Sequence, residues 1–262
     1  MKKVISKQLT KIDKKERKVL EQKKNKFYEE KVSPITEKIE EKIPKKLKDT
    51  LDVAFYNGFN LVLSKGTKYI EKLYDKDKIQ LEHDIKNYAV EKAGTKKSIR
   101  NLDSLSRRSS LINTGISTIE GGGLGLLGIG LPDIPLFITM ILKTIYEISL
   151  SYGFDYAKEE EQLYVLNLIC GALSTGDEQK EYNERLHRLS SDIDGKVVIV
   201  YDLEAEVMKA SKVLSKSMLT SKFIQGLPLV GVVGSVANFK VINKISKFSK
   251  LKYKKRYLLL KQ

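Results

Sequence analysis

The chain has 262 residues, 41% of them hydrophobic, and a formal net charge of +15 at pH 7. Its length allows a full hydrophobic core, its apolar content excludes a disordered chain, and five prolines favour long helices over a turn-rich β-sandwich. One cysteine, Cys170, excludes an internal disulfide, and its apolar surroundings predict a buried thiol. The basic N-terminus has no apolar run behind it, so we expect no signal peptide and a cytoplasmic location.

The positive charge is concentrated towards both ends of the chain. Residues 1–50 carry 17 Lys or Arg against 9 Asp or Glu, and residues 207–262 carry 13 Lys or Arg and no acid. A basic segment beside an apolar one is attracted to anionic lipid, so an anionic membrane surface is the expected partner. Lysine also suits unspecific phosphate contact, but 41 lysines to 7 arginines disfavour base readout, and nucleic acid is not expected. A third interpretation is that the lysines only solvate the surface.

In chain order, the sequence predicts helices almost throughout. Residues 1–32 are expected to form a basic, charged helix or arm, and residues 33–262 one helical domain. Apolar periodicity predicts helices at 45–64, 67–75, 77–92 and 95–119, and Gly94 ends the third of them. Within the third helix, Ile79, Ile85, Tyr88 and Ala89 are expected to face inward.

The second half of the chain continues in the same way. Asp133 is placed to cap a helix over 134–152, and Pro135 is tolerated in its first turn. Further helices are predicted at 155–173, 178–189 and 203–221. The β-rich run 196–201 is interpreted as a helix start or a loop, because a lone strand is marginal. The last segment, 226–260, is predicted to be a helical hairpin or a helix kinked near Gly231 and Gly234.

Two glycine-rich apolar segments, 121–142 and 223–239, are the most distinctive feature of the sequence. The first is long enough to cross a bilayer, but glycines, two prolines and Asp133 interrupt it. Small residues spaced by three or four positions let helices approach closely, either in a membrane or in a tight core. The predicted fold class is therefore all-α, a multi-helix bundle with two glycine-rich apolar helical hairpins.

No catalytic, metal or cofactor site is expected from the residue patterns. Residues 123–128 match the dinucleotide-binding glycine pattern but lack the strand before it and the acid that ends a second strand. His83 and His187 are far apart, without metal-ligand spacing. Asp133 is the carboxylate of most interest, either as a helix cap or as a partner of Lys143 or of a basic residue in the C-terminal tail.

Several motifs resemble the EcsC family. The central signature is resembled by Glu120-Gly-Gly-Gly, by residues 128–135 and by Tyr152-Gly-Phe-Asp155. The C-terminal signature is resembled by Leu227-Pro-Leu-Val-Gly231, Gly234 and Asn238, and the N-terminal landmark by Ile43-Pro44. Lys143 stands where the family leads us to expect arginine, and Phe248 where it leads us to expect a small residue.

The resemblance implies a bacterial, membrane-associated helical protein of uncharacterised biochemical role. The family is named after the third member of an operon whose first two members encode an ABC transporter, and no catalytic activity is established for it. The leading hypothesis is thus a non-catalytic protein at the inner face of the membrane, an accessory or regulator of an ABC transporter or secretion system. The alternatives are a soluble protein-interaction module and a membrane-inserting, pore-forming protein.

The expected site residues fall into two sets. The motif residues expected to matter for structure or function are Glu120, Gly121, Gly128, Pro132, Asp133, Pro135, Tyr152, Gly153, Asp155, Pro228, Gly231, Gly234 and Asn238. The basic residues expected to contact lipid are Lys240, Lys244, Lys247, Lys250, Lys252, Lys254, Lys255 and Arg256.

Overall fold

The computed structural model describes residues 1–21, 43–107, 133–224 and 234–262. These residues are helical apart from short connections and contain no β-strand, which confirms the all-α class. The glycine-rich parts of both predicted hairpins lie outside the described residues.

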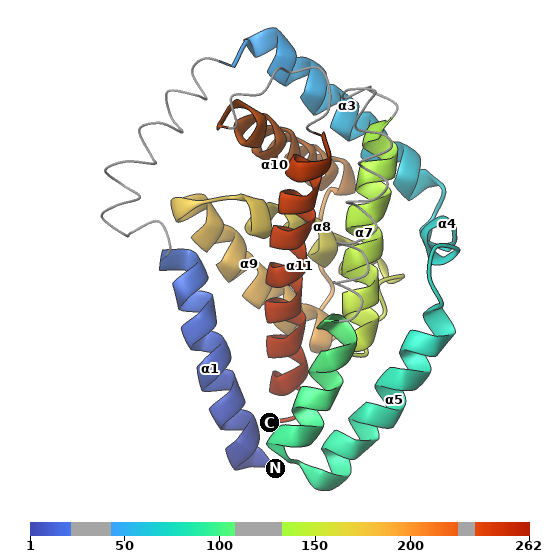
Figure 1. Cartoon of the computed structure of the whole chain (residues 1–262), viewed down its shortest axis with the longest axis vertical. Coiled ribbons are helices and arrows are strands. Elements are labelled where there is room, and N and C mark those ends of the chain that lie inside the picture. Colours follow the sequence, from blue (N-terminus) through green and yellow to red (C-terminus); the bar gives the residue numbers. More distant parts are fainter. Residues whose placement is uncertain (22–42, 108–132, 225–233) are drawn as a thin grey trace.

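The described helices follow the predicted order closely (Figure 1). They are α1 (Lys2–Glu21), α3 (Lys45–Ser64), α4 (Thr67–Glu71), α5 (Lys76–Ala93), α7 (Asp133–Ser151), α8 (Glu159–Leu173), α9 (Gly176–Asp194), α10 (Leu203–Ile224) and α11 (Gly234–Leu259). Residues 96–107 form a further helix. The described part of the predicted C-terminal hairpin is thus one continuous helix from Gly234 onward.

Local chemistry explains where α5 begins and ends. The Asp75 carboxylate accepts a hydrogen bond from the Lys78 backbone N–H at 2.9 Å, which satisfies one of the free donors of the first turn. At the other end Gly94 has φ +55°, a left-handed conformation that costs glycine little, and its N–H donates to the Val90 carbonyl at 2.8 Å.

Helices α7, α8 and α11 form the centre of the molecule. Figure 1 shows α11 running through the middle, beside α7 and α8. Residues 163–173 of α8 are all buried, because α9, α10 and α11 pack around this helix. Cys170 lies in this stretch and is 2% exposed, which confirms the predicted buried thiol.

Helix α7 contains a window, Ile134–Ser151, that is long and apolar enough to cross a membrane. Among the described residues it is the helix that meets this criterion, and 89% of the window is buried inside the fold. Its surfaces contact α3, α4, α5 and α11. The arrangement is that of a core helix, whose apolar character is explained by packing alone.

Two large side chains of α5 are placed opposite to expectation. Ile85 and Tyr88 are each 61% exposed, whereas His83 and Val90 form the buried face of the helix. The prediction that Ile85, Tyr88 and Ala89 face inward is therefore wrong, since Ala89 is exposed as well, and Ile79 is half-buried. His83 takes an inner position because its Nδ1 lies 3.1 Å from the Ser151 carbonyl oxygen, so its polar ring is satisfied on burial.

Two other sequence features are accommodated simply. The run 196–201 is a connection between α9 and α10 with neither strand nor helix, and its Val198 and Val200 are 88% and 94% exposed.

Phe248 of α11 is 4% exposed although a small residue was expected there. Gly171 of α8 provides the room, because a Cβ at Gly171 would lie 3.0 Å from the Phe248 ring.

Candidate functional site

The basic C-terminal half of α11 forms an internal hub of ion pairs. Lys252 pairs with Glu16 of α1, Lys254 with Asp103 of the helix at 96–107, Lys255 with Asp13 and Glu16 of α1, and Arg256 with Glu161 of α8 and Asp194 of α9. Lys252 and Arg256 are each only 3% exposed. The charge of this segment therefore neutralises acids on four neighbouring helices.

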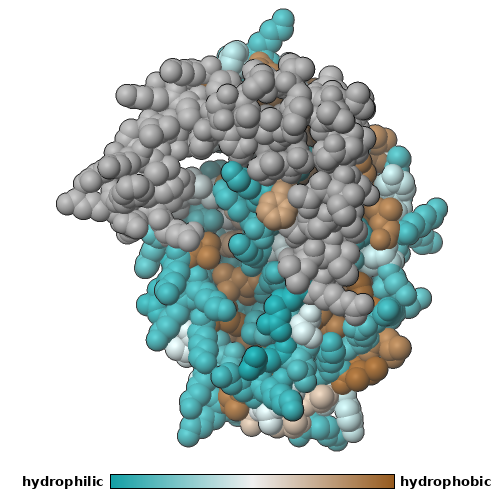
Figure 2. Space-filling view, viewed as in Figure 1, coloured by the Kyte–Doolittle hydropathy of each residue, from teal (hydrophilic) through white to brown (hydrophobic). Residues whose placement is uncertain are grey.

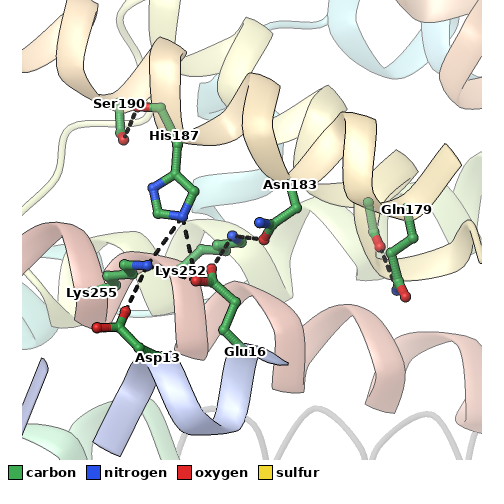
Figure 3. A network of polar contacts seen from close by, with 9 residues as sticks. Asp13, Glu16, Gln179, Asn183, His187, Ser190, Lys252 and Lys255 are labelled. Atoms are coloured by element: carbon green, nitrogen blue, oxygen red, sulfur yellow. Dashed lines mark hydrogen bonds and ion pairs between the residues drawn. The ribbon is translucent and has the colours of Figure 1, made fainter. Parts of the chain in front are cut away.

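The Glu16 cluster joins three helices (Figure 3). Glu16 reaches up from α1, Lys252 and Lys255 come from α11, and Asn183 and His187 come from α9. The Lys252 ammonium donates to both Glu16 and the Asn183 amide oxygen, and the Lys255 ammonium donates to Glu16 at 2.6 Å. Glu16 is 6% exposed, so its charge depends on these donors.

Burial and pairing act against each other in this cluster. Burial opposes ionisation of Glu16, but its contacts with His187, Lys252 and Lys255 outweigh this effect and hold the pKa of the carboxyl well below its ordinary value. Burial lowers the pKa of Lys252 to about 8, although the Glu16 charge favours the ammonium form. Glu16 and Lys252 therefore form an ion pair at neutral pH. Lys252 is the partner that loses its charge first as the pH rises, because burial has lowered its pKa.

His187 of α9 links the two charged partners. Its Nε2 lies 3.1 Å from Lys255 Nζ and 3.4 Å from Glu16 Oε2. The tautomer of the ring decides whether this nitrogen donates to the Glu16 carboxylate or accepts from the Lys255 ammonium.

A testable consequence concerns acid stability. We expect the free energy of unfolding to fall as the pH drops below about 5, since unfolded Glu16 takes up a proton at its ordinary pKa of 4.5 while the folded carboxylate resists protonation to much lower pH. Urea titrations of Glu16→Gln should show a shallower acid slope and lower stability near neutral pH. Exposed Glu21→Gln on the same helix is the control, and an unchanged slope in Glu16→Gln would contradict the assignment.

Arg256 holds the second buried cluster. Its guanidinium donates from Nε and Nη2 to the Asp194 carboxylate at 2.7 to 3.0 Å, and its Nη1 lies 2.6 Å from Glu161 Oε1. The same group stacks over Phe154, with Cζ 4.2 Å from the ring centroid. Burial raises the pKa of Glu161, and the Arg256 charge counteracts this increase.

The segment Tyr152-Gly-Phe-Asp155, which carries part of the family resemblance, surrounds this hub. The Tyr152 hydroxyl donates to Asp103 at 3.1 Å, and Asp103 is also the partner of Lys254. Gly153 has φ +82°, and a Cβ there would lie 2.5 Å from His83 Nε2. Asp155 is exposed and accepts from the Ala157 N–H at 3.1 Å, which stabilises the turn before α8.

The other motif residues are only partly brought together. Pro135 is half-buried in the first turn of α7, where its carbonyl accepts from the Thr139 hydroxyl at 2.8 Å, and Asn238 is half-buried near the start of α11. Asp133 and Gly234 are the first residues of α7 and α11, and the structure does not describe the side-chain contacts of Asp133.

Lys143, one of the residues considered as a partner of Asp133, pairs with Glu147 of its own helix at 3.2 Å. Glu120, Gly121, Gly128, Pro132, Pro228 and Gly231 lie outside the described residues.

The residues expected to contact lipid divide into two groups. Lys240, Lys244 and Lys247 are exposed on the N-terminal and middle turns of α11, and Lys250 is half-buried, with a pKa that burial lowers. The remaining four make the ion pairs described above. In the folded chain, burial removes Lys252 and Arg256 from any direct contact with an outer surface.

The outward face of α1 holds charge that the residue-by-residue prediction did not single out. Ile5, Leu9 and Ile12 pack inward, and the basic residues lie on the other sides of the helix. The exposed cations of α1 are Lys2, Lys3, Lys7, Lys11, Lys14, Lys15, Arg17 and Lys18, its exposed acid is Glu21, and Asp13 is half-buried beside Lys255. The thin apolar stripe in a basic helix was the signal that could have identified this face.

Two further observations bear on chemistry at this hub. Within the described part of the chain, no group of three or more His, Cys, Asp or Glu side chains is arranged to hold a metal ion. The cations and anions of the hub face each other across helix interfaces. What the arrangement does physically is to fasten α1, α8, α9 and the helix at 96–107 to α11.

The chain is similar to known proteins over most of its length. The model of the EcsC protein family matches residues 6–258. Its relatives include YdbA, an uncharacterized protein of Bacillus subtilis (strain 168), which is 26% identical over 172 residues, 60% of this chain and 58% of YdbA. Protein EcsC of the same organism is 26% identical over 151 residues, 55% of this chain and 59% of EcsC. The chain thus spans a little under three fifths of each relative, and no solved structure matches it.

Proposed function

The chain belongs to the EcsC protein family, and we propose that it is a non-catalytic helical protein that associates peripherally with an anionic membrane surface. The observation that supports this proposal is the outward face of α1, which exposes eight cations and one acid. Each Lys or Arg held near an anionic leaflet contributes about 1 kcal/mol of attraction. Figure 2 shows the hydrophilic surface at the lower left, where Figure 1 places α1.

The mode of binding follows from how α1 is docked. Its apolar residues Ile5, Leu9 and Ile12 are at most 8% exposed, because they pack into the core. Contact through the remaining faces is therefore electrostatic and sensitive to salt, rather than an insertion of side chains into the acyl region. Lys240, Lys244 and Lys247 of α11 form a second, smaller set of exposed cations that belongs to the same proposal.

The proposal also covers where the protein lies in the cell and which proteins it contacts. We place the protein in the cytoplasm at the inner face of the membrane, where anionic lipid is enriched. The family resemblance is the ground for an accessory or regulatory role with an ABC transporter or secretion system. Site-specific photo-crosslinking from α1 in native membranes, with the transporter subunits as the identified products, tests this finer role.

The central test is binding to vesicles. The 262-residue chain is sedimented with neutral and with anionic vesicles at low and at high salt, and we expect pelleting with anionic vesicles at low salt that high salt reverses. The variant Lys7→Gln, Lys11→Gln, Lys14→Gln and Lys18→Gln should bind at least tenfold more weakly, as expected for the loss of several contacts of about 1 kcal/mol each. All four side chains are exposed, so the fold should be unaffected.

A matched control separates a local contact from net charge. Lys65, Lys68, Lys72 and Lys78 are also exposed, lie on or beside α4 and α5, and change the net charge equally when replaced by glutamine. Equal weakening by both quadruple variants would contradict the assignment to α1. Wild-type protein that binds no vesicles would overturn the membrane proposal and favour the soluble interaction module, and dye release would favour the pore-forming alternative.

A further inference from the structure

The outward face of α5 carries an apolar stripe that no other part of the described chain covers. Leu81, Ile85 and Tyr88 are each 61% exposed, and Figure 2 shows a hydrophobic patch at the lower right, where Figure 1 places α5. At 3.6 residues per turn these three side chains fall within about 60° of one another around the helix. An exposed apolar stripe of this kind marks an interaction surface.

The stripe has charged ends of opposite sign. Asp77 lies one turn before Leu81 and Lys92 one turn after Tyr88, and both are exposed on the same sector of the helix. The Lys92 ammonium lies 5.5 Å from the centroid of the Tyr88 ring, which keeps this cation beside the stripe. Read along the helix, the order is acid, three apolar residues, base.

This order is complementary to itself when it is reversed. If a second α5 lies antiparallel across the first, with a two-fold axis near Ile85, then Leu81 faces Tyr88 of the second copy and Ile85 lies near Ile85. Asp77 then faces Lys92 of the second copy, and the symmetry produces this ion pair twice. We infer that α5 is a homodimerisation surface, in which two copies of this chain pair antiparallel through Asp77, Leu81, Ile85, Tyr88 and Lys92.

Charge distinguishes this partner from a lipid surface. The exposed charges beside the stripe balance, with Asp77 and Asp84 against Lys78 and Lys92, so an anionic leaflet gains no net attraction where the apolar side chains would have to enter. Asp84 also weakens the dimer, because the two-fold axis brings both Asp84 carboxylates to the same side of the interface, where their like charges repel. The inference is independent of the lipid contact proposed for α1, since it uses a different helix.

Sedimentation velocity of the full chain over a range of protein concentration tests the dimer. We expect a monomer–dimer equilibrium with Kd on the order of micromolar, because the surface is small. Ile85→Asn should weaken it at least tenfold, whereas Val53→Asn, at a site 56% exposed on α3, should have no effect. Asp84→Asn should tighten it, because one like-charge contact is removed.

Charge exchange tests the register. Asp77→Lys alone and Lys92→Asp alone should each weaken the dimer roughly tenfold, because each variant creates two like-charge contacts per dimer. The double variant Asp77→Lys, Lys92→Asp should restore wild-type association. Failure of the double variant to restore it would overturn the antiparallel arrangement even if Ile85→Asn dissociates the dimer.

A cysteine placed at the axis gives a second measurement. Ile85→Cys should form an intermolecular disulfide under mild oxidation, and Val53→Cys should not. The background is low because Cys170 is 2% exposed and burial raises the pKa of its thiol to about 12. A wild-type chain that remains monomeric at all concentrations, with no crosslink from Ile85→Cys, would overturn the proposal.

Discussion

Replacing Arg256 with methionine is expected to lower the free energy of unfolding by about 3–5 kcal/mol, one of the two largest effects that we predict. The guanidinium is 3% exposed and pairs with Glu161 and Asp194. Methionine fills much of the same volume but leaves the Glu161 carboxylate buried without a cation. Chemical denaturation at neutral pH measures the loss directly.

Three further variants separate charge from packing. Arg256→Met combined with Glu161→Gln and Asp194→Asn removes all three charges and should recover at least half of the lost stability, because no unpaired ion remains. Arg256→Lys keeps the charge but loses the two-pronged contact with Asp194 and the stacking on Phe154, so it should also be destabilised. Lys247→Met, at an exposed site on the same helix, should change stability by less than about 0.5 kcal/mol. A loss for Arg256→Met no greater than for Lys247→Met would contradict the ion-pair hub.

The second large effect is expected for Gly153→Ala, at about 3 kcal/mol. The position has φ +82°, which strains any residue with a Cβ. In addition, the new methyl group would meet His83 Nε2 at 2.5 Å. His83 cannot move away freely, because it is 7% exposed and its Nδ1 is within hydrogen-bonding distance of the Ser151 carbonyl oxygen.

A glycine elsewhere in the chain provides the matched control. Gly66 has φ +71°, but a Cβ there would meet no atom within 4 Å. Gly66→Ala therefore measures the backbone strain alone, about 1 kcal/mol. Combining Gly153→Ala with His83→Ala should cost less than the sum of the two single variants, because the clash is relieved. Equal losses for Gly153→Ala and Gly66→Ala would show that the contact with His83 contributes nothing.

The helices themselves were largely predictable from the sequence. The order and approximate bounds of the elements from Lys45 to Leu259 follow from apolar periodicity and from local signals such as Gly94 and Pro44. These signals act within one or two turns, so they are visible in the sequence alone. The family resemblance was equally accessible, because it depends on short motifs at fixed spacing.

The acids that pair with the basic residues of the C-terminal segment could not be predicted in this way. A run that contains Lys252, Lys254, Lys255 and Arg256 is typical of a lipid-binding tail, and residues 207–262 contain no acid that could pair with it. The partners come from helices far away in the sequence, and Glu16 lies 236 positions from Lys252. Periodicity places a side chain on a face of its own helix but does not identify the helix opposite.

The wrong prediction of which face of α5 is buried has the same cause, because periodicity does not identify the neighbouring helix. The apolar residues Ile85 and Tyr88 fit a core-facing pattern at helical spacing, as Val90 does. The fold buries the side that carries His83 and Val90, because the Ser151 carbonyl and α7 lie there. The inward prediction for Ile85 and Tyr88 fails within the single chain, and a second copy of the chain is what would cover them.

The contact between Glu16 and Lys252 also has a consequence for biosynthesis. The ribosome adds about 5–20 residues per second, so α1 waits roughly 12–47 s for its partner on α11 to be made. During translation the nascent N-terminal helix therefore lacks its main partner, α11, until late, although α9, which also contacts α1, is made earlier. A chain that stops before Lys252 would lack the lysines that pair with Glu16, so α1 would be docked by fewer contacts, and an incompletely docked helix is a state that chaperones and proteases recognise.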